Sequence, residues 1–304
     1  GSTAEISSKV PQNEEGYHFV GWNTKADGTG TAYDPNDSFT ITEDTTLYAQ
    51  WAANTNTQYT VEFYYQSNGR YGTTTDIRKT YTGTTGATAV VSEADKIPTE
   101  PGYVFDANAS NVLQDTISGD GSLVLKVYFK QQFTVTISGD SHVQSSSVTD
   151  SVVGWNGSST GNWLLASGYE LDQVIVNGVE TTVSEDSDSI TVTEIQQDTA
   201  IYVKTKAQDQ TYAVQHIDED TGTVLKTSAN KPAKYGDVII GDEQAETIPG
   251  YTFVKADNLT VGINNDANIV KVYYSKDENG PDGKPDGVPD KLQYRITYNR
   301  NAET

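Results

Sequence analysis

The sequence predicts a mainly β fold, of the α+β class with few helical turns, built from small modules that repeat along the chain in an elongated row. Three observations predict it: stretches in which apolar and polar residues alternate, a Gly-Tyr signature that occurs four times, and almost no helical periodicity. Threonine, valine, tyrosine and isoleucine dominate the alternating stretches, and glycine, asparagine, aspartate and serine separate them.

The Gly-Tyr signature marks one place in each module: Gly16-Tyr17, Gly102-Tyr103, Gly168-Tyr169 and Gly250-Tyr251. A closing strand is expected roughly 20 to 35 residues later, at 47–51, 123–129, 200–204 and 269–274. The opening strand of a following module is expected at 59–65, 133–137, 212–217 and 294–298. An aromatic residue at one fixed place in every repeat is typical of a core position, so we interpret the signature as structural rather than as a sugar-binding platform.

These strands divide the chain into units at 1–53, 57–131, 132–207 and 210–276, an acidic linker at 277–292 and the start of a further module at 293–304. The first unit reaches its Gly-Tyr after few residues, so it is predicted to lack its opening strand. Short polar connections favour semi-rigid beads over one fused core. Helical turns are expected only at 92–96, after a Ser92 cap, and at 242–246.

The composition argues against several partners. The 42 acidic and 20 basic residues give a formal net charge of −22, which repels nucleic acid and anionic lipid. No apolar stretch is long enough to cross a membrane, so no membrane contact is expected within this sequence. Cysteine is absent, which excludes disulfides and thiolate chemistry. We expect a monomer.

Enzymatic function is not predicted. The three histidines, His18, His142 and His216, are scattered over three predicted modules, and none lies at metal-ligand spacing from another. Acidic residues are so abundant that no particular pair of carboxylates indicates glycoside hydrolysis.

All four units resemble known repeat families, the third more weakly than the others. Residues 15–24, 30–34 and 44–51, with Gly21-Trp22 after the first Gly-Tyr, resemble the Listeria-Bacteroides repeat, also called the internalin-type B repeat. The fourth unit resembles the mucin-binding-protein (MucBP) repeat through 212–218, 235–237, 248–251 and 272–274, and the second unit is similar to it. The third looks like a divergent B repeat, because no tryptophan follows its Gly-Tyr.

The resemblance implies small β-grasp-like, ubiquitin-like modules in the stalk of a Gram-positive adhesin. Such proteins are secreted, exposed at the bacterial cell surface and in many cases anchored to the cell wall, here through a region outside this sequence. The resemblance implies no catalytic residue. The predicted function is a spacer that projects a distal adhesive domain, and the alternative is direct binding of host mucin or other glycans.

The first candidate binding site is the stretch 155–163, in which two tryptophans flank polar residues and glycines. Trp155 and Trp163 could place two rings around a carbohydrate, with Asn156 and Asn162 as hydrogen-bonding partners. The alternative is a hairpin whose tryptophans both pack inward.

The second candidate site is the acidic segment, where carboxylates recur at a spacing of four among glycines and prolines. Calcium is the cation that such oxygen ligands suit, and no other cofactor is expected. The predicted ligands are Asp277, Asn279, Asp282, Asp286 and Asp290. The spacing departs from an EF-hand, and the alternative is a rigid, solvated linker.

Overall fold

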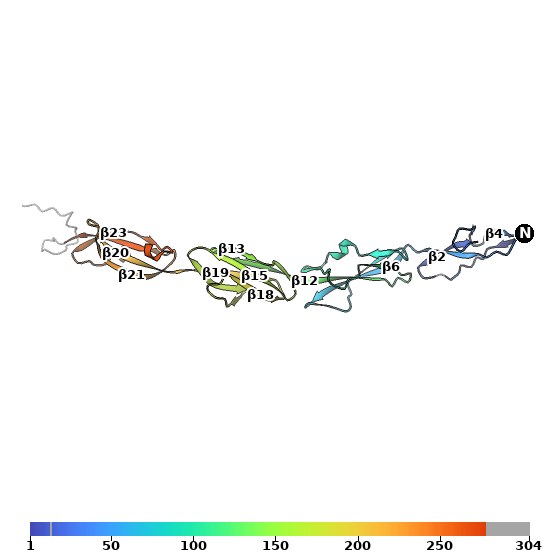
Figure 1. The fold of residues 1–304 in the computed structure, drawn as a ribbon, viewed down its shortest axis with the longest axis horizontal. Helices are drawn as coiled ribbons and strands as arrows, with labels where there is room; N and C mark the ends of the chain where they lie inside the picture. Colours follow the sequence, from blue (N-terminus) through green and yellow to red (C-terminus); the bar gives the residue numbers. More distant parts are fainter. Residues whose placement is uncertain (13, 278–304) are drawn as a thin grey trace, which may run out of the picture. The chain divides into compact units, whose positions relative to one another are not determined.

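The computed structural model describes residues 1–12 and 14–277 (Figure 1). Within this part of the chain nearly all regular structure is β-strand, and helix is limited to three 3₁₀ turns of three or four residues. The predicted mainly β class is therefore confirmed. The chain divides into two compact units: unit 1 contains residues 1–134, 152–158 and 193–198, and unit 2 contains 135–151, 159–192 and the residues from 199 on.

The elements of unit 1 are short strands and one helical turn. They are β1 (Ser2–Glu5), β2 (Tyr17–Asn23), β3 (Ala32–Tyr33), β4 (Ser38–Ile41), β5 (Tyr48–Ala53), β6 (Thr57–Ser67), β7 (Arg70–Tyr71), β8 (Arg78–Gly83), β9 (Thr88–Val90), η1 (Glu93–Lys96), β10 (Tyr103–Phe105), β11 (Gln114–Thr116), the first part of β12 (Val124–Gly139), and β14 (Val152–Gly154).

The main sheet of unit 1 places β6 between β8 and β12, with β10 on the far side of β12. The opening strand β6 and the closing strand β12 run parallel, while β8 and β10 are antiparallel to their neighbours. Alternate residues of β6 and β12 form the core, and each is at most 5% exposed: Val61, Phe63, Leu125, Val127 and Phe129. Each such side chain contributes roughly 1.5 to 3 kcal/mol by leaving water.

The first Gly-Tyr repeat has a smaller sheet in which β2 lies between β3 and β5, with β1 and β4 paired separately. Within the described residues β5 has β2 as its only strand neighbour.

Unit 2 contains the remaining elements, which are again mostly strands. They are the end of β12, β13 (Val143–Val148), most of β15 (Gly157–Leu165), β16 (Tyr169–Val176), β17 (Val179–Thr181), most of β18 (Ser189–Ile195), β19 (Thr199–Ala207), β20 (Asp209–Asp218), β21 (Val224–Lys234), β22 (Val238–Ile239), η2 (Asp242–Gln244), β23 (Tyr251–Ala256), β24 (Leu259–Thr260), η3 (Asn265–Ala267) and β25 (Ile269–Lys276).

The C-terminal sheet of unit 2 repeats the strand order of the main sheet in unit 1. Its order is β21-β20-β25-β23, with β20 and β25 parallel and β23 antiparallel to β25. Its core contains Tyr212, Val214, Val270, Val272 and Tyr274. A second sheet of unit 2 pairs the end of β12 in parallel with β19, which pairs antiparallel with β16. An opening strand beside a parallel closing strand therefore recurs three times.

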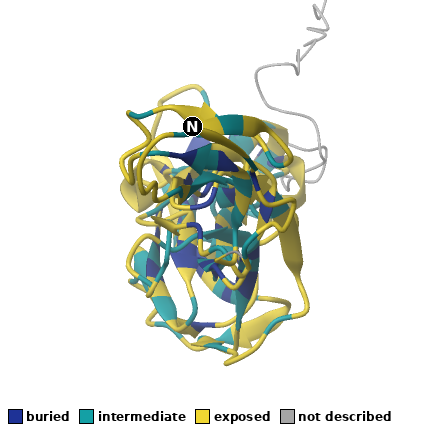
Figure 2. Ribbon diagram, turned by 90° about the vertical axis from the view of Figure 1, so that its right-hand side faces the viewer, coloured by how far each residue is buried: buried dark blue, intermediate teal, exposed yellow. Residues whose placement is uncertain are grey.

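The exposed positions lie mainly on turns and on the outer faces of strands, whereas most of the buried ones lie on the strands (Figure 2). Two of the helical turns fall where the sequence predicts them. η1 begins after Ser92, whose hydroxyl oxygen accepts the amide hydrogen of Asp95 at 3.2 Å. η2 covers the first three residues of the predicted 242–246 turn.

One sequence-based boundary is not a break in the structure. The predicted strands 123–129 and 133–137 form the single strand β12, which continues through Gln131 and Gln132. These glutamines look like a polar connection in the sequence, but their backbones have partners: Gln131 pairs with Tyr103 of β10, and Gln132 with Gly154 of β14. The predicted strand at 294–298, the remainder of the acidic linker and the module start at 293–304 lie outside the described residues.

Candidate functional site

The first tryptophan of the predicted glycan site lies in a tight turn of unit 1. Trp155 and Asn156 connect β14 to β15, and Asn156 adopts a left-handed φ of 57°, which asparagine tolerates. The Asn156 side-chain oxygen accepts a hydrogen bond from the Gln196 side chain at 2.8 Å. The Trp155 ring is half-buried, 6.2 Å from the Phe133 ring, and a Cβ added at Gly69 would lie 2.4 Å from the indole. One side of Trp155 is therefore already packed.

The second tryptophan lies inside unit 2. Trp163 is 6% exposed in β15, and its indole N–H donates to the carbonyl of Ser187 at 3.1 Å. Asn162 is exposed, and its side-chain amide donates to the Thr160 carbonyl at 3.4 Å. Trp163 thus packs inward, as the hairpin alternative expects. Glycan binding at this stretch stays a prediction.

Of the predicted calcium ligands, only Asp277 is described, and it is fully buried. Its backbone amide donates to the Gly250 carbonyl at 2.9 Å, and its carboxylate accepts the hydroxyl of Thr252 at 2.8 Å. Among the described residues no group of three or more His, Cys, Asp or Glu side chains could hold a metal ion. The other predicted ligands lie outside the described residues: Asn279, Asp282, Asp286 and Asp290.

The feature shared by all four repeats is the Gly-Tyr turn. Its glycines have φ angles in the left-handed region, at 85°, 78°, 88° and 76° for Gly16, Gly102, Gly168 and Gly250. A residue with a side chain would pay about 1 to 2 kcal/mol for this conformation, which explains the glycine. The tyrosine that follows begins the strand that pairs antiparallel with the closing strand: β2, β10, β16 or β23.

Each Gly-Tyr turn is hydrogen-bonded to one residue of the closing segment. This residue directly follows the last one that pairs with the strand after the Gly-Tyr turn. The carbonyl of the glycine accepts that residue's backbone amide in every repeat. The four donors are Asn54 at 2.7 Å, Gln132 at 2.8 Å, Gln208 at 2.9 Å and Asp277 at 2.9 Å. Asp277 therefore occupies the position that asparagine or glutamine occupies in the other repeats, and its backbone amide makes the same hydrogen bond.

Two of these donors also bond to the segment that follows them. In unit 1 the Asn54 carbonyl accepts the amide of Thr85 at 2.9 Å, and in unit 2 the Gln208 carbonyl accepts the amide of Tyr235 at 2.9 Å. A relay of two backbone hydrogen bonds thus joins a Gly-Tyr turn, the inter-strand connection and a turn of the next predicted module. We call this arrangement the junction relay.

The junction relays are closely packed. A Cβ added at Gly16 would lie 2.4 Å from the Cα atom of Gly119, and one added at Gly168 would lie 2.5 Å from the ring of Tyr235. The connections are also short, since β5 ends at Ala53 and β6 begins at Thr57, and β19 and β20 are separated by one residue. Little backbone is left that could bend without breaking these contacts.

The tyrosines of the signature are half-buried and held by different partners. Tyr169 stacks on His142 with ring centroids 3.7 Å apart and contacts Tyr235 edge-on at 5.5 Å. The Tyr103 hydroxyl donates to the Gln66 carbonyl at 3.0 Å. These contacts agree with the structural interpretation of the signature.

The Tyr251 hydroxyl contacts a carboxylate. It donates to Asp218 at 3.3 Å. Burial pushes the pKa of Asp218 up, but hydrogen bonds from Asp220 and Thr221 outweigh it and hold the pKa below its usual value. Asp218 is therefore charged at neutral pH and accepts from this tyrosine.

Sequence reasoning missed a β-bulge that follows the signature. The pairing register shifts at the fourth residue after the glycine in three repeats, at Val20, Asp172 and Val254. In the remaining repeat β10 ends just before that position. A bulge turns its extra residue out of the ladder, which explains why Val20 and Val254 are 50% and 39% exposed. The available sequence signal for the bulge was an apolar residue four positions after the glycine. Such a residue is normally interpreted as part of the core.

Sequence reasoning also missed a buried carboxylate beneath η1. Asp95 has a side chain 3% exposed and accepts hydrogen bonds from Lys79 at 2.6 Å, Tyr81 at 2.7 Å and Ser92 at 2.9 Å. Burial raises its pKa, but these three donors outweigh burial and hold the pKa below its usual value. The cluster fixes η1 against β8.

A second polar cluster surrounds His216 in unit 2. The imidazole is fully buried, and its Nδ1 lies 3.1 Å from the Tyr274 hydroxyl, while its Nε2 lies 3.8 Å from the carboxylate of Glu246. Glu246 is also ion-paired with Lys226. Burial lowers the pKa of His216, with Lys226 and Lys231 adding to the effect and Glu246 opposing it.

Comparison with known proteins identifies the class of the first repeat. A family model described as the Listeria-Bacteroides repeat domain matches residues 2–50. This match confirms the resemblance for that part of the chain, whereas the MucBP resemblance stays a prediction. Among the described residues no helix has the length and apolar character needed to cross a membrane.

Two relatives come from Evansella cellulosilytica. One, named as a Gly-rich membrane protein, is 51% identical over 57 residues, 18% of this chain and 6% of its own length. The other, named as a membrane protein, is 41% identical over 54 residues, 17% of this chain and 8% of its own. The chain thus spans less than a tenth of either relative. The solved structure of the Bacillus anthracis TIE protein matches 75% of this chain and 54% of that one, with 12% identity and a TM-score of 0.27.

Proposed function

We propose that this chain is a non-enzymatic stalk region of a secreted bacterial cell-surface protein, in which the repeats act as a spacer that projects an adhesive domain located elsewhere. The observation that carries the proposal is the junction relay. A relay through Asn54 and another through Gln208 replace the free linker that a hinged chain would need. A series of such junctions favours a stiff, extended stalk.

Three further observations support the proposal. The Listeria-Bacteroides repeat lies in residues 2–50, and the two Evansella relatives are named as membrane proteins, which suits a surface location with an anchor outside this sequence. The net charge of −22 keeps separate copies apart, which suits a monomer, and disfavours nucleic acid as a partner.

Small-angle scattering tests the stalk. A compact chain of this length should have a radius of gyration of about 19 Å, whereas globules arranged in a line should give about 40 Å by the same scaling and simple geometry. A flexible Gly-Ser insertion after Gln208 should lower the measured value by allowing the junction to bend. A value near 19 Å for the unmodified chain would refute the proposal.

Direct binding of mucin or another host glycan is the second candidate function. What favours it is the half-buried Trp155 beside Asn156 in unit 1. Calcium remains the one proposed cofactor, at the acidic segment that begins with Asp277. Heat released on calcium addition in calorimetry is the test, and a flat titration would remove it.

A further inference from the structure

The outer strand of the main sheet in unit 1 has backbone groups that face away from the sheet. Among the described strands β8 pairs with β6 only, and the amide of Phe63 donates to the carbonyl of Ile77 at 3.0 Å. Bonded and non-bonded pairs alternate along an antiparallel ladder. Arg78, Thr80 and Thr82 therefore direct their N–H and C=O groups outward, and within the described residues of unit 1 no hydrogen bond reaches these groups.

The corresponding outer strand of unit 2 carries two devices against pairing that β8 lacks. β21 contains Pro232, and its register with β20 shifts at two places. Proline and bulges are two of the devices by which edge strands avoid new partners, and charged side chains, which β8 has at Arg78 and Lys79, are another. β8 contains no proline, and its pairing with β6 runs without a shift from Arg78 to Gly83. The same topology thus has a blunted edge in one sheet and a regular edge in the other.

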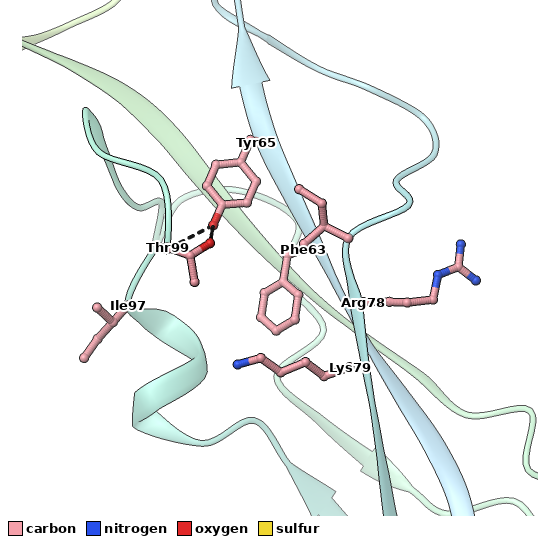
Figure 3. Close-up of a pocket in the computed structure, with 7 residues that line it drawn as sticks. Phe63, Tyr65, Arg78, Lys79, Ile97 and Thr99 are labelled. Atoms are coloured by element: carbon pink, nitrogen blue, oxygen red, sulfur yellow. Dashed lines mark hydrogen bonds between the residues drawn. The ribbon is translucent and has the colours of Figure 1, made fainter.

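An apolar cleft of about 110 Å³ lies at the start of β8 (Figure 3). The buried Phe63 lies between its walls, and two exposed aliphatic residues contribute to them: Ile77 is 47% exposed and Ile97 69%. The Tyr65 hydroxyl and Thr99 are hydrogen-bonded at 3.2 Å along one side, as Figure 3 shows. An apolar cavity of this size class holds one small apolar group.

The charges beside the cleft are arranged on both faces of β8. The Lys79 amino group lies 5.2 Å from the Phe63 ring, where Asp95 holds it. Arg78 points the other way, as Figure 3 shows, and its guanidinium donates to the Thr75 carbonyl at 3.0 Å while remaining exposed. Arginine has five donors in a fixed fork, so donors remain for an incoming carboxylate.

We propose that β8 is a docking edge for an extended segment of a partner protein. The segment adds as a strand beside Arg78, Thr80 and Thr82, and it places one apolar side chain in the cleft. Neighbouring residues of a strand point to opposite faces, so the residue next to this apolar anchor faces Arg78 and is acidic. The partner is therefore a segment in which apolar and acidic residues alternate. This binding role goes beyond that of a spacer.

Charge favours such a partner over a second copy of the chain. A second copy brings a net charge of −22 to a chain of the same charge, whereas a short segment brings only a few carboxylates, one of which meets Arg78, so the segment is repelled less. Backbone hydrogen bonds would supply affinity without sequence preference. The cleft and Arg78 would supply selectivity for particular side chains of the partner segment.

The test uses the full chain and a blocked synthetic peptide of alternating leucine and glutamate, with a leucine and lysine peptide of equal length as comparison. Binding is measured by titration calorimetry, and its place by amide hydrogen exchange. We expect the acidic peptide to bind, to slow exchange at Arg78, Thr80 and Thr82, and to bind at least tenfold more tightly than the basic peptide. No binding of the acidic peptide at millimolar concentration overturns the proposal.

The key variant is Thr80→Pro, because it removes an outward N–H while leaving the ladder to β6 intact. Thr80→Val is the matched control, since it changes the side chain and keeps the N–H. We expect at least tenfold weaker binding by Thr80→Pro and unchanged binding by Thr80→Val. Equal peptide binding by both variants overturns the proposal that the segment pairs with the edge of β8. Equal binding of the acidic and basic peptides overturns the proposed role of Arg78.

Two further variants keep the proposal testable if Thr80→Pro does not fold. Ile97→Asp changes an exposed wall of the cleft, and Arg78→Gln removes the charge that faces the acidic residue. Each should weaken binding of the acidic peptide by about tenfold with unchanged thermal melting. Concentration-dependent dimers in sedimentation that disappear in Arg78→Gln would identify a second copy as the occupant and contradict the proposed partner.

Discussion

Substituting Gly168 by alanine should weaken the junction relay of unit 2. The left-handed φ of 88° costs alanine about 1 to 2 kcal/mol. The added Cβ would lie 2.5 Å from the Tyr235 ring, so the ring must shift, and overpacking of this kind costs about 1 to 3 kcal/mol. The total is about 2 to 5 kcal/mol, and it falls at the turn that bonds Gln208.

Gly178→Ala is the matched control. Gly178 also has a left-handed φ, at 79°, but an added Cβ there would meet nothing within 4 Å. It should therefore cost only the conformational part, about 1 to 2 kcal/mol. The difference between the two variants isolates the contact with Tyr235.

Amide hydrogen exchange of the whole chain is the assay, because it reads local opening site by site. The reporters are the amides of Gln208 and Tyr235, which form the relay. With a tenfold change for every 1.4 kcal/mol, Gly168→Ala should speed their exchange by roughly 30-fold or more. Gly178→Ala should leave them unchanged. Equal exchange at these amides in Gly168→Ala and in the unmodified chain would refute the reasoning.

Two other predictions concern unit 2 and the tryptophan turn. The folded pKa of His216 lies below its unfolded value, so the contribution of this group to the stability of unit 2 should be fully present above about pH 6.5 and be lost as the pH falls below it. His216→Phe should remove this part of the pH dependence of stability in urea unfolding. An unchanged dependence on pH would contradict the prediction. If glycans bind at Trp155, a glycan array should lose its signal with Trp155→Ala, and an equal signal would exclude that site.

The strands and the structural role of the Gly-Tyr signature were predictable from the sequence because they depend on local chemistry. Alternation marks a half-buried strand, and an aromatic residue at one fixed place in every repeat marks a core position. The Ser92 cap was predictable for the same reason, since its hydroxyl binds an amide three residues on. Structure that depends on interactions between residues close together in the sequence could therefore be inferred.

The parts that could not be predicted depend on partners far along the chain. Gln131 and Gln132 belong to a continuous strand only because β10 and β14 supply their hydrogen-bond partners. The bulge at Val20 is a matter of register, which a single sequence does not contain. Asp95 looks like a surface acid until Lys79 and Tyr81 are brought to it by β8.

The candidate sites show the same division. Trp163 was named from its residue type, but its burial depends on the carbonyl of Ser187, which lies in a different segment. The cleft beside β8 has no sequence signal of its own, since Ile77 and Ile97 become neighbours only when the segment after η1 folds back over the sheet. A binding surface of this kind has to be read from the structure.

The two sheets with the same strand order carry different residues at one equivalent position. Phe63 follows Val61, which pairs with Leu125, and His216 follows Val214, which pairs with Val270 in the same way. Beside Phe63 the outer strand contributes Ile77 and the space stays open.

Beside His216 the outer strand contributes Lys226, and its ion pair with Glu246 covers the imidazole. A half-exposed ion pair adds little to stability, so its main effect is to fill the position that is a cleft in unit 1. One repeated scaffold thus carries a closed polar site and an open apolar one. A spacer role requires neither of these two sites. A function specific to one repeat is therefore best sought at the open apolar cleft of unit 1.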